Sequence, residues 1–187
     1  GAFYSGNSEV VPDIGLLRNY YAFTWGDALF VTIDPYWGSP VCVDNPFYGG
    51  AKRSNLWDIT HGDAQYQWLK RTLEQSPAKY KFVFIHHLVG GLDDSARGGS
   101  EAAALYEWGG KGKDGKDEFK ARRPGWEMPI HQLLARHKVA AVFHGHDHFF
   151  ARQELDGVAY IMVPQPGHPG FDRLRNVEEY GYIRGEF

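Results

Sequence analysis

The sequence is short of cysteine, of long apolar runs and of any large excess of charge. Cys42 is the only cysteine among the 187 residues, which excludes an intrachain disulfide framework and a cysteine-rich zinc site. No apolar stretch approaches the roughly 20 residues that a membrane-spanning helix needs. A net charge of −3 offers no broad basic surface for a nucleic-acid backbone. Any metal site must therefore use His, Asp, Asn and Glu side chains, and neither nucleic acid nor membrane is an expected partner.

Hydrophobic residues, by contrast, make up 43% of the chain and aromatic residues 16%, which is enough to bury a core. Short apolar runs and glycine-containing turns predict a β-hairpin over 20–33, buried strands over 80–85 and 139–143, and a terminal pair of strands over 149–155 and 158–163. Amphipathic patterns predict helices over 63–76 and 129–138, with Asp63 capping the first and Pro129 opening the second.

Two longer segments separate these elements. Residues 35–61 contain several Pro and Gly residues, and we expect a surface excursion there. Residues 88–128 are rich in Gly, Lys and Asp and too long for an ordinary connection, so we interpret them as an insertion loop at the rim of a site. Strands 80–85 and 139–143 are each followed closely by histidine. Two histidine-bearing loops should thus lie at the carboxyl ends of two strands, which is where sites form in α/β proteins.

Residues 144–148 read HGHDH, with three histidines in five positions. Alternating histidines at the end of a strand can direct two imidazoles toward one point, and Gly145 permits a tight bend between them. Neutral imidazole is a good ligand for zinc, iron or manganese. His86, at the end of the other strand, supplies a third candidate ligand.

Two families with histidine-rich motifs fit this pattern less well. A histidine-triad nucleotide hydrolase has apolar residues between its histidines, where this chain has Gly145 and Asp147. A metallo-β-lactamase-type hydrolase has a similar cluster with wider spacing and a following helix, whereas the residues after His148 read as a strand. Both remain alternatives, the second more than the first.

A third resemblance is more extensive. Gly145-His146-Asp147-His148 resembles the Gly-His-x-His motif of calcineurin-like metallophosphoesterases, and Val83-Phe84-Ile85-His86 resembles the Val-x-x-His motif of their purple acid phosphatase-like branch. The likeness extends over residues 19–164 and implies an α/β (α+β) fold, the C-terminal half of a four-layer α-β-β-α sandwich. The family's three earlier motifs are missing, so residues 1–187 are interpreted as the C-terminal part of a single domain whose upstream half is the expected partner.

The resemblance also implies a function, namely hydrolysis of a phosphate ester by a metal-bound hydroxide at a two-metal site. Residue by residue, His86 and His146 would bind one metal and His148 the other. The cofactors would be two divalent or trivalent transition metals, Fe, Mn or Zn, and the general acid would come from the upstream half. The alternative is a truncated or degenerate module that binds a metal or a partner without catalysis.

Several nearby residues are candidates for supporting roles. His87 and His144 adjoin the motif histidines and are candidates for contact with a ligand histidine or the substrate, and Asp147 is a candidate to orient an imidazole. Arg97 is a candidate phosphate contact, and Trp108 a candidate to stack on an aromatic leaving group. Asp34 ends a strand without the motif of a ligand and is expected in a structural role. The remaining histidines are expected at the surface: His61, His131, His137 and His168.

Overall fold

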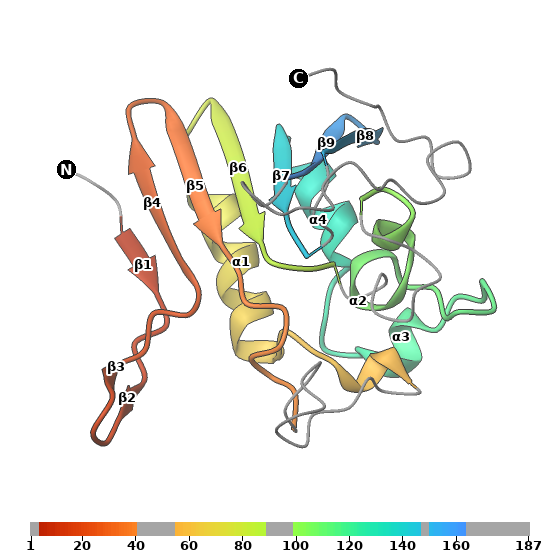
Figure 1. Cartoon of the computed structure of the whole chain (residues 1–187), viewed down its shortest axis with the longest axis horizontal. Helices are drawn as coiled ribbons and strands as arrows, with labels where there is room; N and C mark the ends of the chain where they lie inside the picture. Colours follow the sequence, from red (N-terminus) through yellow and green to blue (C-terminus); the bar gives the residue numbers. More distant parts are fainter. Residues whose placement is uncertain (1–3, 41–54, 89–98, 147–149, 164–187) are drawn as a thin grey trace, which may run out of the picture.

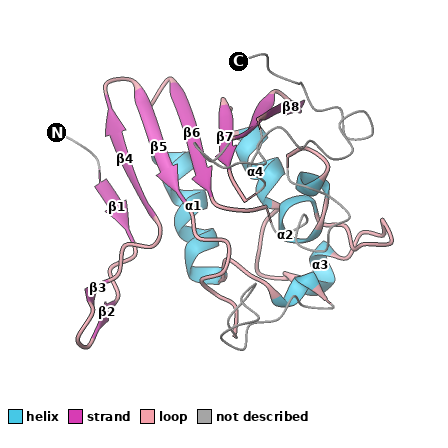
Figure 2. Cartoon of the chain, in the orientation of Figure 1, coloured by secondary structure: helices cyan, strands magenta, loops and turns pink. Residues whose placement is uncertain are grey.

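The computed structural model describes residues 4–40, 55–88, 99–146 and 150–163, and its main feature is a seven-stranded mixed sheet (Figures 1 and 2). The strand order is β1-β4-β5-β6-β7-β9-β8. The strands are β1 (Tyr4–Gly6), β4 (Tyr21–Trp25), β5 (Ala28–Thr32), β6 (Tyr80–Ile85), β7 (Ala141–His144), β8 (Ala151–Leu155) and β9 (Val158–Met162), and a separate ribbon pairs β2 (Val10–Val11) with β3 (Gly15–Leu16).

The centre of the sheet is parallel. Strand β6 pairs in parallel with β5 and with β7, and β7 pairs in parallel with β9, whereas β1, β4 and β8 join antiparallel. The predicted hairpin is confirmed, with Trp25 paired to Ala28 and Gly26 in the left-handed conformation that such a turn needs. The two predicted histidine-bearing strands are neighbours, so their carboxyl ends meet at one edge of the sheet.

One face of the sheet is covered by helices. Helix α1 (Asp63–Gln75) and helix α4 (Ile130–Arg136) lie behind the strands in Figure 1. Their buried side chains, such as Leu69 and Leu133, belong to the same core cluster as Val31 and Val83 of the sheet. The prediction that Asp63 caps this helix is wrong. Gly62 is the N-cap, Asp63 is the first helical residue, and no side chain makes a capping hydrogen bond. Among the described residues, no helix is long and apolar enough to cross a membrane.

The opposite face of the sheet has no helix against it in the described part of the chain (Figure 1). Because side chains alternate along a strand, Phe30, Phe82 and Phe84 lie on this face while their neighbours enter the core. Ring centroids of Phe30 and Phe82 are 5.6 Å apart, and those of Phe84 and Phe143 are 5.1 Å apart. Phe23 stacks on Phe30 at 5.1 Å. We call this row of five phenylalanines the aromatic face.

The two segments expected as a surface excursion and a loop contain ordered, buried structure. The first includes η2 (Leu56–Asp58), whose Leu56 and Trp57 are core residues. The described part of the second contains η4 (Ala102–Ala104), α2 (Tyr106–Gly109) and α3 (Phe119–Arg122). Trp108 is fully buried in the core, so the expectation that it stacks on a leaving group is wrong. In the described part of this segment, buried apolar side chains such as Phe119 and Trp126 belong to the core.

A buried carboxylate joins these segments. Glu107 is fully buried and accepts hydrogen bonds from Thr60 Oγ1, from the backbone and Nδ1 of His61, and from Arg123 Nε. Burial by itself raises the pKa of Glu107, but the hydrogen bond and charge of His61 and the charge of Arg123 outweigh it and hold the pKa below its usual range. The expected surface position of His61 is therefore wrong. His131 is also buried, and its Nδ1 lies 2.7 Å from Tyr160 Oη.

Replacing Glu107 with Ala should destabilise the fold strongly. Arg123 and His61 would lose the carboxylate that compensates their burial, so we expect the free energy of unfolding to fall by about 3–5 kcal/mol in urea denaturation. Glu74→Ala, which removes only the exposed partner of Lys70 within α1, should change it by less than about 1 kcal/mol. Equal losses in the two variants would contradict the role of this network.

The aromatic face should bind an apolar dye in the isolated chain. These phenylalanines are only partly buried, and contiguous apolar surface of this kind is uncommon on a monomeric domain, so we expect native-state fluorescence of 8-anilinonaphthalene-1-sulfonate with this chain. Replacing Phe30 and Phe84 together with Thr should lower that fluorescence while the circular dichroism spectrum is retained. Val10→Thr, on the separate β2 ribbon, serves as the control, and an equal decrease with it would contradict the assignment.

Candidate functional site

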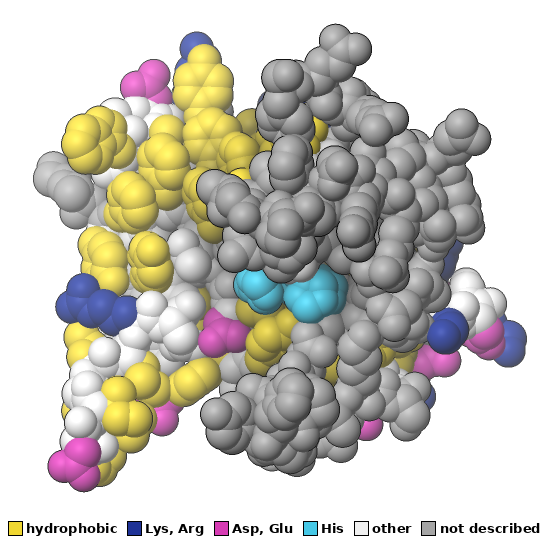
Figure 3. All heavy atoms as spheres, in the orientation of Figure 1, with side chains coloured by type: hydrophobic (Ala, Val, Ile, Leu, Met, Phe, Trp, Pro, Cys, Tyr) yellow, Lys and Arg dark blue, Asp and Glu magenta, His cyan; other side chains and the backbone are white. Residues whose placement is uncertain are grey.

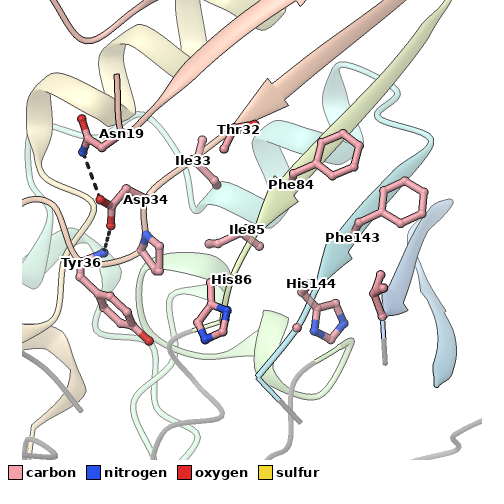
Figure 4. A pocket seen from close by; sticks show the side chains of 13 residues that line it. Asn19, Thr32, Ile33, Asp34, Tyr36, Phe84, Ile85, His86, Phe143 and His144 are labelled. Carbon is pink, nitrogen blue, oxygen red and sulfur yellow. Dashed lines mark hydrogen bonds between the residues drawn. The ribbon is translucent and has the colours of Figure 1, made fainter. Parts of the chain in front are cut away.

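A pocket of about 640 Å³ lies at the carboxyl ends of β5, β6 and β7 (Figure 4). We call it the edge pocket. It combines apolar walls with a carboxylate and two imidazoles. Its lining residues are Asn19, Thr32, Ile33, Asp34, Pro35, Tyr36, Phe84, Ile85, His86, Phe143, His144, Gly145 and Val163. One end of the aromatic face thus continues into the pocket.

Asp34 supplies a firmly held carboxylate on one side of the edge pocket. Its Oδ2 accepts a hydrogen bond from Asn19 Nδ2 at 3.1 Å, and its Oδ1 accepts one from the backbone N–H of Tyr36 at 2.9 Å (Figure 4). The Gln65 side chain bonds both the N–H and the C=O of Asp34, which ties the end of β5 to helix α1. Asp34 therefore has the structural role expected from the sequence and also faces the pocket.

Sequence reasoning had not singled out Asn19 or Tyr36 as pocket residues. Asn19 immediately precedes the β4–β5 hairpin, and Tyr36 follows Asp34 by two positions. Their position depends on hairpin pairing, which brings the residues before β4 beside those after β5. The one available signal was that Tyr36 follows the carboxyl end of a strand beside the histidine strand.

Two candidate ligand histidines lie close together at this edge. His86 is exposed directly after β6, and the backbone N–H of Gly145 donates to the His86 carbonyl at 2.9 Å, which joins the two loops. The ring centroids of His86 and His146 are 5.6 Å apart, with an angle of 82° between the rings. The backbone bend expected at Gly145 falls instead at His146, whose φ is 83°. Figure 3 shows histidine side chains gathered on this face next to an acidic side chain.

The geometry of His86 and His146 is compatible with a shared ion. The lone pair of an imidazole nitrogen lies in the ring plane, so two ligands to one metal need ring planes that intersect, as these nearly perpendicular rings do. A metal–nitrogen bond of about 2.1 Å places ring centres at tetrahedral angles roughly 5 Å apart. Within residues 4–40, 55–88, 99–146 and 150–163, however, no group of three or more His, Cys, Asp or Glu side chains forms a metal site.

The other sequence-predicted residues fall into two groups. Arg97, Asp147 and His148 lie outside the described residues. His87 and His144 are described and both are buried. His87 stacks on His146, whereas His144 lines the edge pocket. The structure therefore brings four of the candidate histidines to one edge of the sheet.

His144 is held in its neutral form by the protein interior. Only 3% of it is exposed, and its Nδ1 has no hydrogen-bond partner among the described residues. Desolvation by burial lowers the pKa of His144 to about 3. At neutral pH the side chain is an uncharged imidazole.

Comparisons with known proteins give a limited likeness. No protein-family model matches the sequence, and no curated protein matches it. Among solved structures, the chain is similar to a purple acid phosphatase isolated from seeds of yellow lupin (Lupinus luteus). The superposition has a TM-score of 0.42 and 13% sequence identity, and it covers 77% of this chain and 22% of the lupin chain. This chain thus spans less than a quarter of the length of the lupin protein.

Burial of neutral His144 should make the fold less stable at acidic pH. The folded pKa of about 3 lies below the ordinary value of 6.5, so the unfolded chain takes up the proton first and stability falls as pH drops through 6.5. Between pH 7.5 and 5.5, His144 should remove about 1.4 kcal/mol from the free energy of unfolding in urea. His144→Leu, or His144→Gln if that variant folds poorly, should be less pH-dependent by this amount. An unchanged pH dependence in the variants would contradict the assignment.

Proposed function

We propose that this chain is the histidine-bearing part of a metal-dependent phosphoester hydrolase, a phosphatase or phosphodiesterase. The observation that carries the proposal is the pair His86 and His146, with ring centroids 5.6 Å apart and nearly perpendicular planes, at the carboxyl ends of adjacent parallel strands. In this proposal both imidazoles bind the same metal. His148 binds a second metal, as the Gly-His-x-His resemblance implies.

The aromatic face supports a second part of the proposal, namely an upstream half of the same protein. A largely parallel sheet usually has both faces covered, and a contiguous apolar patch on one face marks a surface that another element or domain packs against. A second sheet packed against the aromatic face would bury these rings and complete a four-layer α-β-β-α sandwich. The upstream half would also bring the remaining metal ligands and the general acid to the edge pocket.

The residues of this chain would then have separate roles at the site, namely metal binding, positioning and exclusion of water. Two bound transition metals, Fe, Mn or Zn, would lower the pKa of a coordinated water and neutralise charge on a phosphoryl group. His86 and His146 would bind as neutral imidazoles, the form of the side chain that coordinates a metal. Asp34 keeps Asn19 and Tyr36 in place at the pocket wall. Phe84 and Phe143 keep water from the apolar side of the pocket.

A non-catalytic metal-binding module is the second candidate for the chain by itself. Such a module would hold one metal ion weakly through His86 and His146, because no group of three or more potential ligands occurs among the described residues. Under either candidate the isolated chain should turn over p-nitrophenyl phosphate poorly. The two candidates differ in the protein that includes the upstream half, since only the hydrolase gains turnover there.

Replacing His146 with Ala should weaken metal binding in the isolated chain and abolish turnover in the longer protein. Loss of a partner that merely orients a ligand costs 10–100-fold, so loss of the ligand should cost at least about 100-fold in turnover. Zinc titration calorimetry on the chain, and hydrolysis of p-nitrophenyl phosphate and bis(p-nitrophenyl) phosphate by the longer protein, measure the two effects. His86→Ala should behave in the same way.

His137→Ala is the matched control, because His137 lies at the end of α4 and outside the edge pocket. It should leave both zinc affinity and turnover unchanged. Equal loss in the His137 and His146 variants, or loss in neither, would refute the metal-site assignment. Ordinary enzymatic turnover by the isolated chain would refute the need for an upstream half.

A further inference from the structure

Beside the two proposed ligands lies an imidazole with different surroundings. His87 follows His86 directly, but alternation continues past the strand, so His86 is exposed while His87 is fully buried. The His87 ring lies flat on the His146 ring, with centroids 3.9 Å apart and only 13° between the planes. Its Nδ1 is 3.5 Å from the hydroxyl of Tyr36, a residue of the edge-pocket wall.

This stacking excludes His87 as a ligand to the same ion as His146. Imidazole lone pairs lie in the ring plane, and two stacked rings with centroids 3.9 Å apart and only 13° between their planes cannot both direct a nitrogen lone pair at one ion about 2.1 Å away. The planes of His86 and His146 do meet. His86 can therefore share an ion with His146, whereas His87, its neighbour in the sequence, cannot.

His146 also has a backbone that needs external support. Its φ of 83° is in the left-handed region, which is uncommon for a residue with a Cβ and is maintained only where surrounding contacts determine it. A flat, buried ring against one face of the His146 imidazole restricts rotation about its side-chain bonds. Stacked aromatic contacts are favourable in their own right.

We propose that His87 is the positioning residue for His146. Its buried ring, in contact with the Tyr36 hydroxyl, holds the His146 imidazole at a steep angle to that of His86, so that both planes pass through one point. The inference rests on the proposed function, because it assigns to His87 the support of a metal ligand. The positioning role requires a flat ring at position 87, and it does not depend on the protonation state of that ring.

The test compares His87→Phe, which keeps a flat ring, with His87→Leu and His87→Gln, which do not. In zinc titration calorimetry on the 187-residue chain, the two ringless variants should bind zinc roughly tenfold more weakly than wild type, the usual scale for loss of a ligand's supporting partner. His87→Phe should stay within about twofold of wild type. A purely structural role predicts lower thermal stability in all three variants with zinc affinity unchanged, and that result would overturn the proposal.

A second readout needs no metal. In the wild-type chain the His146 ring protons should show an upfield ring-current shift by NMR, which should persist in His87→Phe and disappear in His87→Leu. Absence of the shift in wild type would overturn the proposal even if the leucine variant folds poorly. Loss of zinc affinity in His146→Ala, without loss in His87→Leu, would refute the positioning role alone. A His146→Ala variant that binds zinc like wild type would refute the proposed function and the positioning role together, whether or not the wild-type chain shows the ring-current shift.

Discussion

The parallel pairing of β6 with β7 is the constraint on which the rest of the candidate site depends. Parallel strands end at the same edge, so one register determines how far apart the residues after both strands lie. The hydrogen bond from Gly145 to the His86 carbonyl extends that pairing one step past the strands. The separation of the two imidazoles thus follows from backbone hydrogen bonding in the centre of the sheet.

The two faces of the sheet differ in the kind of side chain packed on them. The helix-covered face buries charge as well as apolar surface, and Glu107 is tolerated there because a cation and several hydrogen-bond donors surround it. The aromatic face consists of phenylalanine rings in mutual contact. Polar interactions thus connect the segments that pack on one side of the sheet, while the other side presents a row of contacting phenylalanine rings.

Local patterns in the sequence were sufficient for the strands and the main helices. Alternation and helical periodicity indicated β6, β7 and α1, and histidine after each strand indicated His86 and His146. They were insufficient where a contact joins distant residues. Arg123 compensates Glu107 from sixteen positions away, so a charged residue in a stretch that reads as a polar loop is fully buried. The stacking of His87 on His146 likewise depends on sheet pairing, which no local pattern encodes.

The alternation along β7 has a consequence for how this protein can change. Phe143 belongs to the aromatic face and His144 to the interior, and the next turn delivers His146 to the edge. A single inserted or deleted residue in this strand would exchange the two faces and shift the turn by about 3.3 Å, so ring, buried histidine and candidate ligand would be misplaced together. A substitution in β7 affects one of these three positions, whereas a change in the length of the strand affects all three at once.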